Sequence, residues 1–359
     1  MPQHPPQKER ENKFVTGLLN WNKIKNNREM PWKGEKDPYK IWLSEIILQQ
    51  TRVEQGWTYY NNFVQTYPTI NDLAKAPEGE VFKLWEGLGY YTRCRNLIAT
   101  AAYISKELKG VFPNEYSSIL ALKGVGPYTA AAIGSFAFNL PYAVVDGNVF
   151  RVLARVFDIE LPIDTTGGKN YFSSLAQRLL PINEAGIYNQ AIMDFGATIC
   201  KPQPECAHCF FNKDCLAYLK NKQLTLPVKG KKTAVKERWF HYVIVKCNNE
   251  YAIRQRSDKD IWQNLYEFLL VEGDKKLTEE KLLTQVEKSY GIEASAINEF
   301  YFLKEIKQRL SHQVIYFSFY LLELAAAPSM ESFIWTKKDD LKSFAFPKTL
   351  AQIVVKELY

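Results

Sequence analysis

The sequence predicts two domains, a mainly α-helical first domain at residues 8–225 and a smaller α+β domain at residues 239–359. Three observations lead to this fold class. The 359 residues exceed what one hydrophobic core usually serves. In the first part of the chain, apolar residues recur at spacings of three and four, as in Trp42, Leu43, Ile46 and Ile47, which is the period of a helix. In the last part, apolar and polar residues alternate, as they do in strands.

Residues 226–238, LPVKGKKTAVKER, separate the two domains. This segment is basic and contains few large apolar residues, which is typical of a linker. Beyond it we expect strands at 242–245, 251–253 and 314–322. A helix is expected over 278–290 with Thr278 as its N-cap, because threonine is a favoured capping residue.

The composition is that of a soluble intracellular protein with a mild basic excess. Lys and Arg number 46 against 39 Asp and Glu, which gives a net charge of +7 and suits a polyanionic partner. The polar start lacks the apolar core of an export signal, and the longest apolar stretch, 314–327, contains Glu323 and is too short to span a bilayer. We therefore expect no membrane partner, and a cytoplasmic, nucleoid-associated location if the source is bacterial.

Four of the six cysteines are clustered, separated by five, two and five residues. They are Cys200, Cys206, Cys209 and Cys215. In a reducing compartment such clustering predicts a metal site rather than disulfides. Thiolates suit both zinc and an iron–sulfur cluster, and the compact run favours the cluster. The isolated Cys94 and Cys247 are expected to be packing residues.

Residues 122–136, LKGVGPYTAAAIGSF, predict a helix, a tight turn and a second helix. Gly124 and Gly126 permit the turn, and Pro127 suits the first position of the second helix. Free backbone N–H groups at such a helix start bind phosphate without sequence preference. We assign phosphate binding to Gly124, Val125 and Gly126; an ordinary helix–helix corner is the alternative.

Two acidic residues have unusual surroundings. Glu45 lies within the apolar run IWLSEIIL, where burial raises the pKa of a carboxyl group and prepares it as a general acid; the alternative is a side chain that points to solvent. Asp146 follows a short apolar run and precedes a predicted helix, so it is an expected N-cap. The same carboxylate could also face a developing cation.

These motifs together resemble the helix–hairpin–helix DNA glycosylases that carry an iron–sulfur cluster. The resemblance rests on LKGVGPYT, on Asp146 twenty residues after Gly126, and on the four-cysteine loop. The segments WLSEIILQQTRV and EGLGYYTRCRNL narrow it to adenine DNA glycosylases of the MutY type, over nearly all of residues 14–218. The resemblance implies a two-lobed helical domain with a 4Fe–4S loop. It also implies a monomer that removes adenine mispaired with 8-oxoguanine from double-stranded DNA.

The resemblance assigns roles by motif. Glu45 would protonate adenine and later activate water, and Asp146 would stabilise the oxocarbenium-like sugar. Tyr128 and Asn148 would complete the catalytic set. The family pattern places four residues around the extruded adenine: Arg28, Trp32, Leu48 and Gln190. It places four more near the opposite, oxidised base: Gln50, Thr51, Leu88 and Tyr90. The four cysteines would hold the cluster, although their first gap is five residues where the family has six.

The second domain resembles the family's Nudix-like domain through IWQNLYEFLL. The run of metal-binding glutamates of Nudix hydrolases is absent from TEEKLLTQVEKSYG, so we expect recognition rather than hydrolysis. Ser311 and His312 match a family loop read as FSH that contacts 8-oxoguanine, whereas Leu310 departs from it. A structural histidine in a turn is the alternative for His312.

Two other functions fit parts of this pattern. An endonuclease-type glycosylase would carry a nucleophilic lysine where this chain has Tyr128, so we expect little or no strand cleavage. A protein that only binds lesions would keep the hairpin and the cysteines but lack the acidic pair, and both acids are present.

Overall fold

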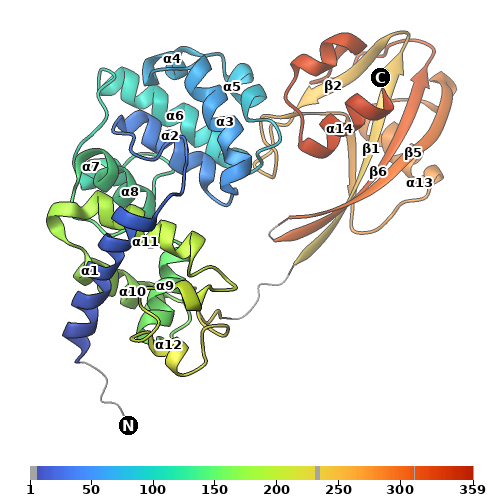
Figure 1. The fold of residues 1–359 in the computed structure, drawn as a ribbon. Coiled ribbons are helices and arrows are strands. Elements are labelled where there is room, and N and C mark those ends of the chain that lie inside the picture. The colour runs from blue at the N-terminus through green and yellow to red at the C-terminus, as the bar shows by residue number, and fades with distance from the viewer. Residues whose placement is uncertain (1–5, 231–234, 311, 359) are drawn as a thin grey trace. The chain divides into compact units, whose positions relative to one another are not determined.

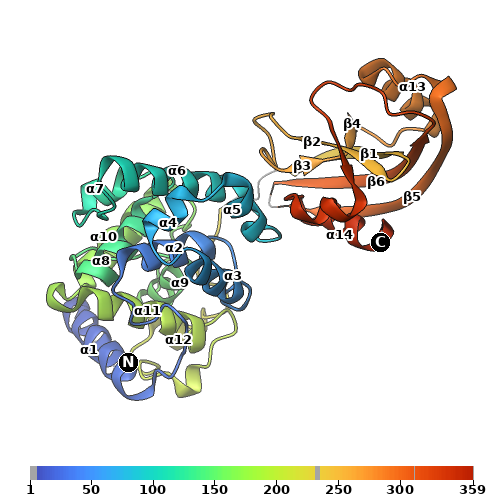
Figure 2. The same ribbon diagram turned by 90° about the horizontal axis from the view of Figure 1, so that it is seen from above.

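The computed structural model describes residues 6–230, 235–310 and 312–358, which form two compact units. The first unit comprises the described parts of Met1–Lys75 and Arg95–Lys231, and the second those of Ala76–Cys94 and Lys232–Tyr359. Figures 1 and 2 show the first unit as a set of packed helices and the second as a sheet with helices. No helix among the described residues is both long and apolar enough to cross a membrane.

The first unit is helical, as predicted. Its helices are α1 (Gln7–Lys25), α2 (Pro38–Leu48), α3 (Val53–Thr66), α4 (Ile70–Lys75), most of α6 (Tyr91–Glu107), α7 (Tyr116–Leu120), α8 (Pro127–Phe138), α9 (Gly147–Phe157), α10 (Thr166–Leu179), α11 (Ala185–Thr198) and α12 (Leu216–Leu219), with the short 3-10 helices η1 (Ile182–Glu184) and η2 (Cys206–His208).

One core of the first unit joins the N-terminal helix to helices far along the chain. On α9 the buried residues Val149, Val152, Leu153 and Val156 follow the three–four spacing that gives a helix one apolar face. This face packs with α1, α10 and α11 in a single hydrophobic cluster that includes Phe14. The cluster fixes the start of α9 and therefore the position of Asp146.

Helix α2 is enclosed on nearly all sides. It begins with Pro38 after the N-cap Asp37, whose carboxylate accepts a hydrogen bond from the Tyr39 amide at 2.9 Å. Every residue from Ile41 to Ile47 is buried, and α2 packs against α3 and α8. Glu45 is part of this buried run, so the fold removes its carboxyl group from bulk water.

The turn between α7 and α8 has the predicted form. Gly124 adopts a φ of +80°, and a Cβ there would come within 2.8 Å of the Asn96 side chain, so the turn requires glycine on both counts. Gly126 caps α8, which begins at Pro127. The turn thus presents the start of an apolar helix, as expected for a helix–hairpin–helix.

The second unit contains a seven-stranded sheet. Its strands are β1 (Lys236–Cys247), β2 (Glu250–Gln255), β3 (Tyr266–Glu267), β4 (Leu269–Gly273), β5 (Ile297–Arg309), β6 (Gln313–Leu324) and β7 (Ile334–Lys337). The main order is β3-β2-β1-β6-β5, with β4 paired to β1 and β7 to β2. β1 and β6 run parallel, and the other pairs are antiparallel. The strands predicted at 242–245, 251–253 and 314–322 are confirmed.

Helices cover both faces of this sheet (Figure 2). Successive side chains of a strand point to opposite faces, so Phe240, Tyr242 and Ile244 pack in the core that contains α14 (Lys348–Glu357). Val243 and Val245 pack on the other face with α13 (Glu279–Tyr290). The predicted N-cap of α13 is confirmed, since the Thr278 hydroxyl accepts from the Lys281 amide at 3.4 Å. The 3-10 helices η3 (Ala294–Ala296) and η4 (Lys338–Ser343) complete the unit.

The unit boundaries differ from the sequence expectation in two places. β1 begins at Lys236, inside the segment 226–238, because 236–238 pair with 313–315 of β6. The segment Ala76–Cys94, with α5 (Glu78–Trp85), groups with the second unit. There Lys83 donates to the Phe344 carbonyl at 3.1 Å, and the Phe346 amide donates to Glu86 at 3.0 Å. Cys94 and Cys247 are buried, as predicted for packing residues.

Candidate active site

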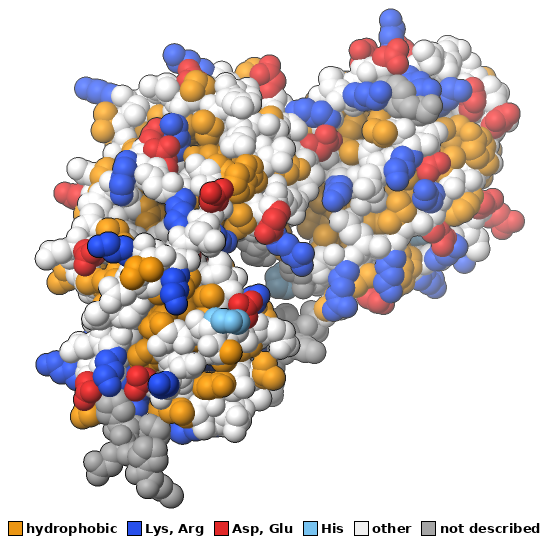
Figure 3. Space-filling view, viewed as in Figure 1, with side chains coloured by type: hydrophobic (Ala, Val, Ile, Leu, Met, Phe, Trp, Pro, Cys, Tyr) orange, Lys and Arg blue, Asp and Glu red, His pale blue; other side chains and the backbone are white. Residues whose placement is uncertain are grey.

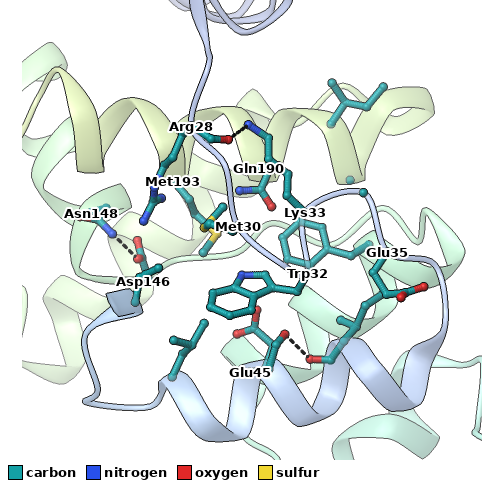
Figure 4. A pocket seen from close by; sticks show the side chains of 18 of the residues that line it. Arg28, Met30, Trp32, Lys33, Glu35, Glu45, Asp146, Asn148, Gln190 and Met193 are labelled. Carbon is teal, nitrogen blue, oxygen red and sulfur yellow. Dashed lines mark hydrogen bonds between the residues drawn. The ribbon is translucent and has the colours of Figure 1, made fainter. Parts of the chain in front are cut away.

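The helical unit contains a cavity of about 370 Å³ beside the middle of α2. Its walls come from the segment after α1, from α2, and from the starts of α8, α9 and α11. The cavity brings together nine of the residues singled out in the sequence. They are Arg28, Trp32, Glu45, Leu48, Thr51, Tyr128, Asp146, Asn148 and Gln190. Figure 4 shows the Trp32 indole next to Glu45, with Asp146 and Asn148 to one side.

Glu45 has the environment of a proton donor. Its side chain is 6% exposed, and burial raises its pKa to about 7. A hydrogen bond from the Tyr128 hydroxyl opposes this rise, and the negative charge of Asp146 adds to it. Burial therefore favours the neutral, protonated form of Glu45.

Asp146 is held by the start of α9. One carboxylate oxygen accepts from the Val149 amide at 2.7 Å, and the other accepts from the Asn148 side chain at 2.7 Å. Arg151 fixes the Asn148 amide by donating to its oxygen at 2.8 Å. Burial raises the pKa of Asp146, while these hydrogen bonds lower it. The predicted N-cap is confirmed, and the Asp146 side chain lines the cavity beside Asn148 (Figure 4).

Trp32 supplies a flat apolar wall. Its ring packs edge-on against Tyr60 at 5.3 Å between centroids and lies 6.4 Å from Trp57. Leu48 of α2 also lines the cavity. A slot with one aromatic wall and a few convergent polar groups suits a planar heterocycle. The other lining residues include Met30, Lys33 and Met193, which belong to no motif that predicted a site.

The residues expected near the opposite base are distributed over both units. Gln50 is exposed, and Thr51 reaches the cavity. Leu88 and Tyr90 belong to the segment that groups with the second unit; Leu88 is buried, whereas Tyr90 is 45% exposed. Gln50 and Tyr90 both have a positive φ, 58° and 50°, which is costly for residues other than glycine and concentrates at functional sites.

Tyr90 rests on a cation. The Arg93 guanidinium carbon lies 5.1 Å from the centre of the Tyr90 ring and 5.4 Å from that of Trp85. Such stacking restrains an exposed ring without burying it. In the second unit, His312 is exposed, and the neighbouring Leu310 amide donates to the Gln313 carbonyl at 2.8 Å. The prediction for Ser311 falls outside the described residues.

The four clustered cysteines line one small cavity at the end of the helical unit. Among the described residues no three His, Cys, Asp or Glu side chains already stand in a metal-coordinating arrangement. The surroundings nevertheless fit a thiolate-bound cluster. The Phe211 amide donates to the Cys209 sulfur at 3.4 Å, and Arg155 donates to the Cys200 sulfur at 3.5 Å. Burial raises the pKa of Cys209 to about 12 and that of Cys215 to about 11, so a bound metal would have to displace the thiol protons.

Lys and Arg side chains are scattered over the drawn face of the helical unit instead of forming one patch (Figure 3). The charge of +7 therefore does not locate a nucleic-acid surface by itself. The α7–α8 turn is the more specific candidate. The first amides of α8 have no partner within the helix, and the positive end of the helix dipole lies there.

Comparison with known proteins finds families that match parts of the chain. Residues 43–165 match the HhH-GPD superfamily of base excision DNA repair proteins, and residues 241–356 match the NUDIX domain. An adenine DNA glycosylase of Buchnera aphidicola subsp. Baizongia pistaciae (strain Bp) is 32% identical over 352 residues, which cover 96% of each chain. An adenine DNA glycosylase of Mus musculus is 41% identical over 215 residues, 57% of this chain and 42% of the other.

Solved structures agree for the helical unit. A thermostable thymine-DNA glycosylase superposes with a TM-score of 0.55 at 31% identity, over 59% of this chain and 98% of the other. Endonuclease III in a non-covalent complex with DNA superposes with a TM-score of 0.51 at 20% identity, over 60% of this chain and 99% of the other. The second similarity supports the fold alone.

Proposed function

We propose that this chain, which belongs to the adenine DNA glycosylase family and is therefore a hydrolase of N-glycosyl bonds, removes adenine mispaired with 8-oxoguanine or guanine in duplex DNA. The observation that supports the chemistry is the meeting of Glu45 and Asp146 in one cavity of the helical unit. Their surroundings differ, and two carboxyl groups in different environments can divide the roles of acid and anion.

Adenine must first leave the base stack, which costs a few kcal/mol, and enter the slot beside Trp32. Glu45, with its pKa near 7, then donates its proton to a ring nitrogen of adenine. The bond between the sugar C1′ and the base breaks, and its electron pair stays on the now neutral adenine. The Tyr128 hydroxyl stabilises the Glu45 carboxylate left behind, because it hydrogen-bonds to that side chain.

Asp146 acts on the sugar. Bond cleavage leaves positive charge on C1′ and the ring oxygen, and a nearby carboxylate lowers the energy of that cation. The hydrogen bonds from Val149 and Asn148 hold the Asp146 oxygens in place and favour their ionised form. Glu45 then accepts a proton from the water that attacks C1′, which restores the acid. Tyr128 stands where a lyase would need a lysine nucleophile, so the reaction ends at an abasic site.

Further parts of the chain would serve DNA binding. Backbone amides at 124–126 would bind phosphate, and Gln50, Thr51, Leu88 and Tyr90 would contact the opposite base. The Nudix-like unit would recognise 8-oxoguanine through Ser311 and His312. The four cysteines would hold a 4Fe–4S cluster. Arg155 of α9 donates to the Cys200 sulfur and so connects the loop to the helices, and within the loop the Phe211 amide donates to the Cys209 sulfur.

An excision assay with defined mispairs tests this function. We expect abasic sites at adenine opposite 8-oxoguanine and guanine, and none opposite thymine. Glu45→Gln should abolish excision while preserving DNA binding, and the exposed Glu54→Gln on α3 is the matched control. Full activity of Glu45→Gln would overturn the acid assignment, and no excision by the cluster-loaded protein would overturn the function.

A further inference from the structure

A third carboxyl group, which the proposed mechanism does not use, lies beside the cavity. Asp194 of α11 is fully buried, one helical turn after Gln190. Its Oδ1 accepts from Arg28 Nη1 at 2.8 Å and from Gln190 Nε2 at 2.9 Å. Its Oδ2 accepts from Asn26 Nδ2 at 2.8 Å and lies 3.1 Å from Lys33 Nζ. Three of these four partners, Arg28, Lys33 and Gln190, line the cavity.

The partners come from two distant parts of the chain. Arg28 and Lys33 belong to the non-helical segment between α1 and α2, and Lys33 also donates to the Arg28 carbonyl at 2.7 Å. A buried carboxylate is tolerated only when it is paired and hydrogen-bonded, and this one has two cations and two amides. Asp194 therefore anchors the segment that carries Trp32 and Arg28 to α11.

Asp194 also determines which end of the Gln190 amide faces the cavity. Asp194 Oδ1 accepts a hydrogen bond from Gln190 Nε2, so the NH₂ group of the Gln190 amide is turned toward Asp194. Its amide oxygen is then left as an acceptor at the end of the cavity above Trp32 (Figure 4). An acceptor at this position favours a base edge that carries an exocyclic amine, and it repels one that carries a carbonyl oxygen.

We propose that Asp194 is a positioning residue that fixes the Gln190 amide and thereby makes the cavity selective for a purine with an exocyclic amine. The inference rests on the proposed function, because it assumes that the flipped base occupies this cavity. In this proposal Asp194 does not contact the base. Its effect is transmitted through one hydrogen bond of 2.9 Å.

The test compares single-turnover excision of adenine, purine and hypoxanthine, each opposite 8-oxoguanine. Purine lacks the amine, and hypoxanthine replaces it with a carbonyl. The three bases differ in how easily their glycosidic bonds break. This difference cancels when the rate for each base, divided by the rate for adenine, is compared between variant and wild type. For Asp194→Asn, whose amide can also donate, we expect the preference for adenine over hypoxanthine to fall roughly tenfold or more.

Three further variants separate positioning from general damage. Gln190→Ala should lose the same selectivity, and adding Asp194→Asn to it should reduce selectivity no further. Asp194→Glu, which keeps the acceptor, should restore part of the preference. Asp158→Asn is the matched control, because Asp158 is a largely buried carboxylate on the same unit that pairs with Lys220 at 2.7 Å outside the cavity. It should leave selectivity unchanged.

The outcomes are distinguishable. Inactive wild-type protein would overturn the proposed function. Active wild type with the same adenine-to-hypoxanthine ratio in Asp194→Asn would overturn only this inference. If Asp194→Asn does not fold, the Gln190→Ala ratio decides alone: an unchanged ratio would show that the amide does not read the base.

Discussion

The ionisation of Glu45 should make the free energy of unfolding depend on pH, and the substitution Glu45→Gln should remove this dependence. Its pKa is about 7 in the folded protein against an ordinary value of 4.5, mainly because the side chain is buried. Each tenfold change in a proton equilibrium is worth about 1.4 kcal/mol, so the difference, 7 − 4.5, corresponds to about 3 kcal/mol. The free energy of unfolding should fall by about this amount when Glu45 is ionised in the folded protein.

The sign follows from which state keeps the proton. Below pH 4.5 Glu45 is protonated in both states, and its contribution to stability is fully present. Between pH 4.5 and 7 the unfolded chain releases a proton that the folded protein retains, so stability falls as the pH rises. Above pH 7 the loss is complete. Glu45→Gln cannot ionise, so it should gain about 3 kcal/mol relative to wild type between pH 4.5 and 8.

Urea unfolding at a series of pH values measures this gain. The difference in unfolding free energy between Glu45→Gln and wild type is the relevant quantity, because the titration of other groups, Asp146 included, is largely common to both proteins. Exposed Glu54→Gln should show no such trend. Parallel curves for wild type and Glu45→Gln from pH 4.5 to 8 would refute the reasoning, since they would mean that the Glu45 carboxyl group is as solvated in the folded protein as in the unfolded chain.

Three further predictions concern the active-site pair Glu45 and Tyr128, the α7–α8 turn and the cysteine loop. The excision rate should decline as the pH rises through about 7, the pKa of Glu45. Tyr128→Phe removes a hydrogen bond that lowers this pKa, so the decline should move to higher pH in the pH–rate profile of the variant. Gly124→Ala should destabilise the protein by about 1–3 kcal/mol and weaken DNA binding, because the φ of +80° and the contact with Asn96 both oppose a side chain. Urea unfolding and a DNA-binding titration measure the two effects, with Gly79→Ala as the control variant, since a Cβ at Gly79 meets nothing within 4 Å. Cys209→Ser should lower the iron content and the melting temperature, and equal iron in variant and wild type would exclude Cys209 as a cluster ligand.

The fold was predictable wherever local pattern and burial agree. The alternation at 242–245 and the capping threonine at 278 identify their elements because strand faces and helix starts are properties of neighbouring residues. The grouping of Ala76–Cys94 with the second unit was not predictable. It depends on hydrogen bonds to main-chain groups of Phe344 and Phe346, which lie about 260 residues further along the chain. Main-chain contacts of this kind produce no periodic pattern in the sequence.

The site was predictable for a different reason, and only in part. Glu45 and Asp194 present the same pattern, an acid inside an apolar helix, and both are buried in the structure. What distinguishes them is the loop that follows α1. Its residues Arg28 and Lys33 approach Asp194 within 3.1 Å, whereas no ion pair to Glu45 is formed among the described residues.

This difference decides the chemistry of the cavity. Asp194 has two cationic partners, Arg28 and Lys33, and accepts a hydrogen bond from Gln190, so it can orient the Gln190 amide. Among the described residues, Glu45 has the Tyr128 hydroxyl as a hydrogen-bond partner and the charge of Asp146 nearby, and burial raises its pKa to about 7. Sequence patterns can therefore locate buried acids in such a cavity, but the path of a loop without periodicity determines which of them is paired with cations.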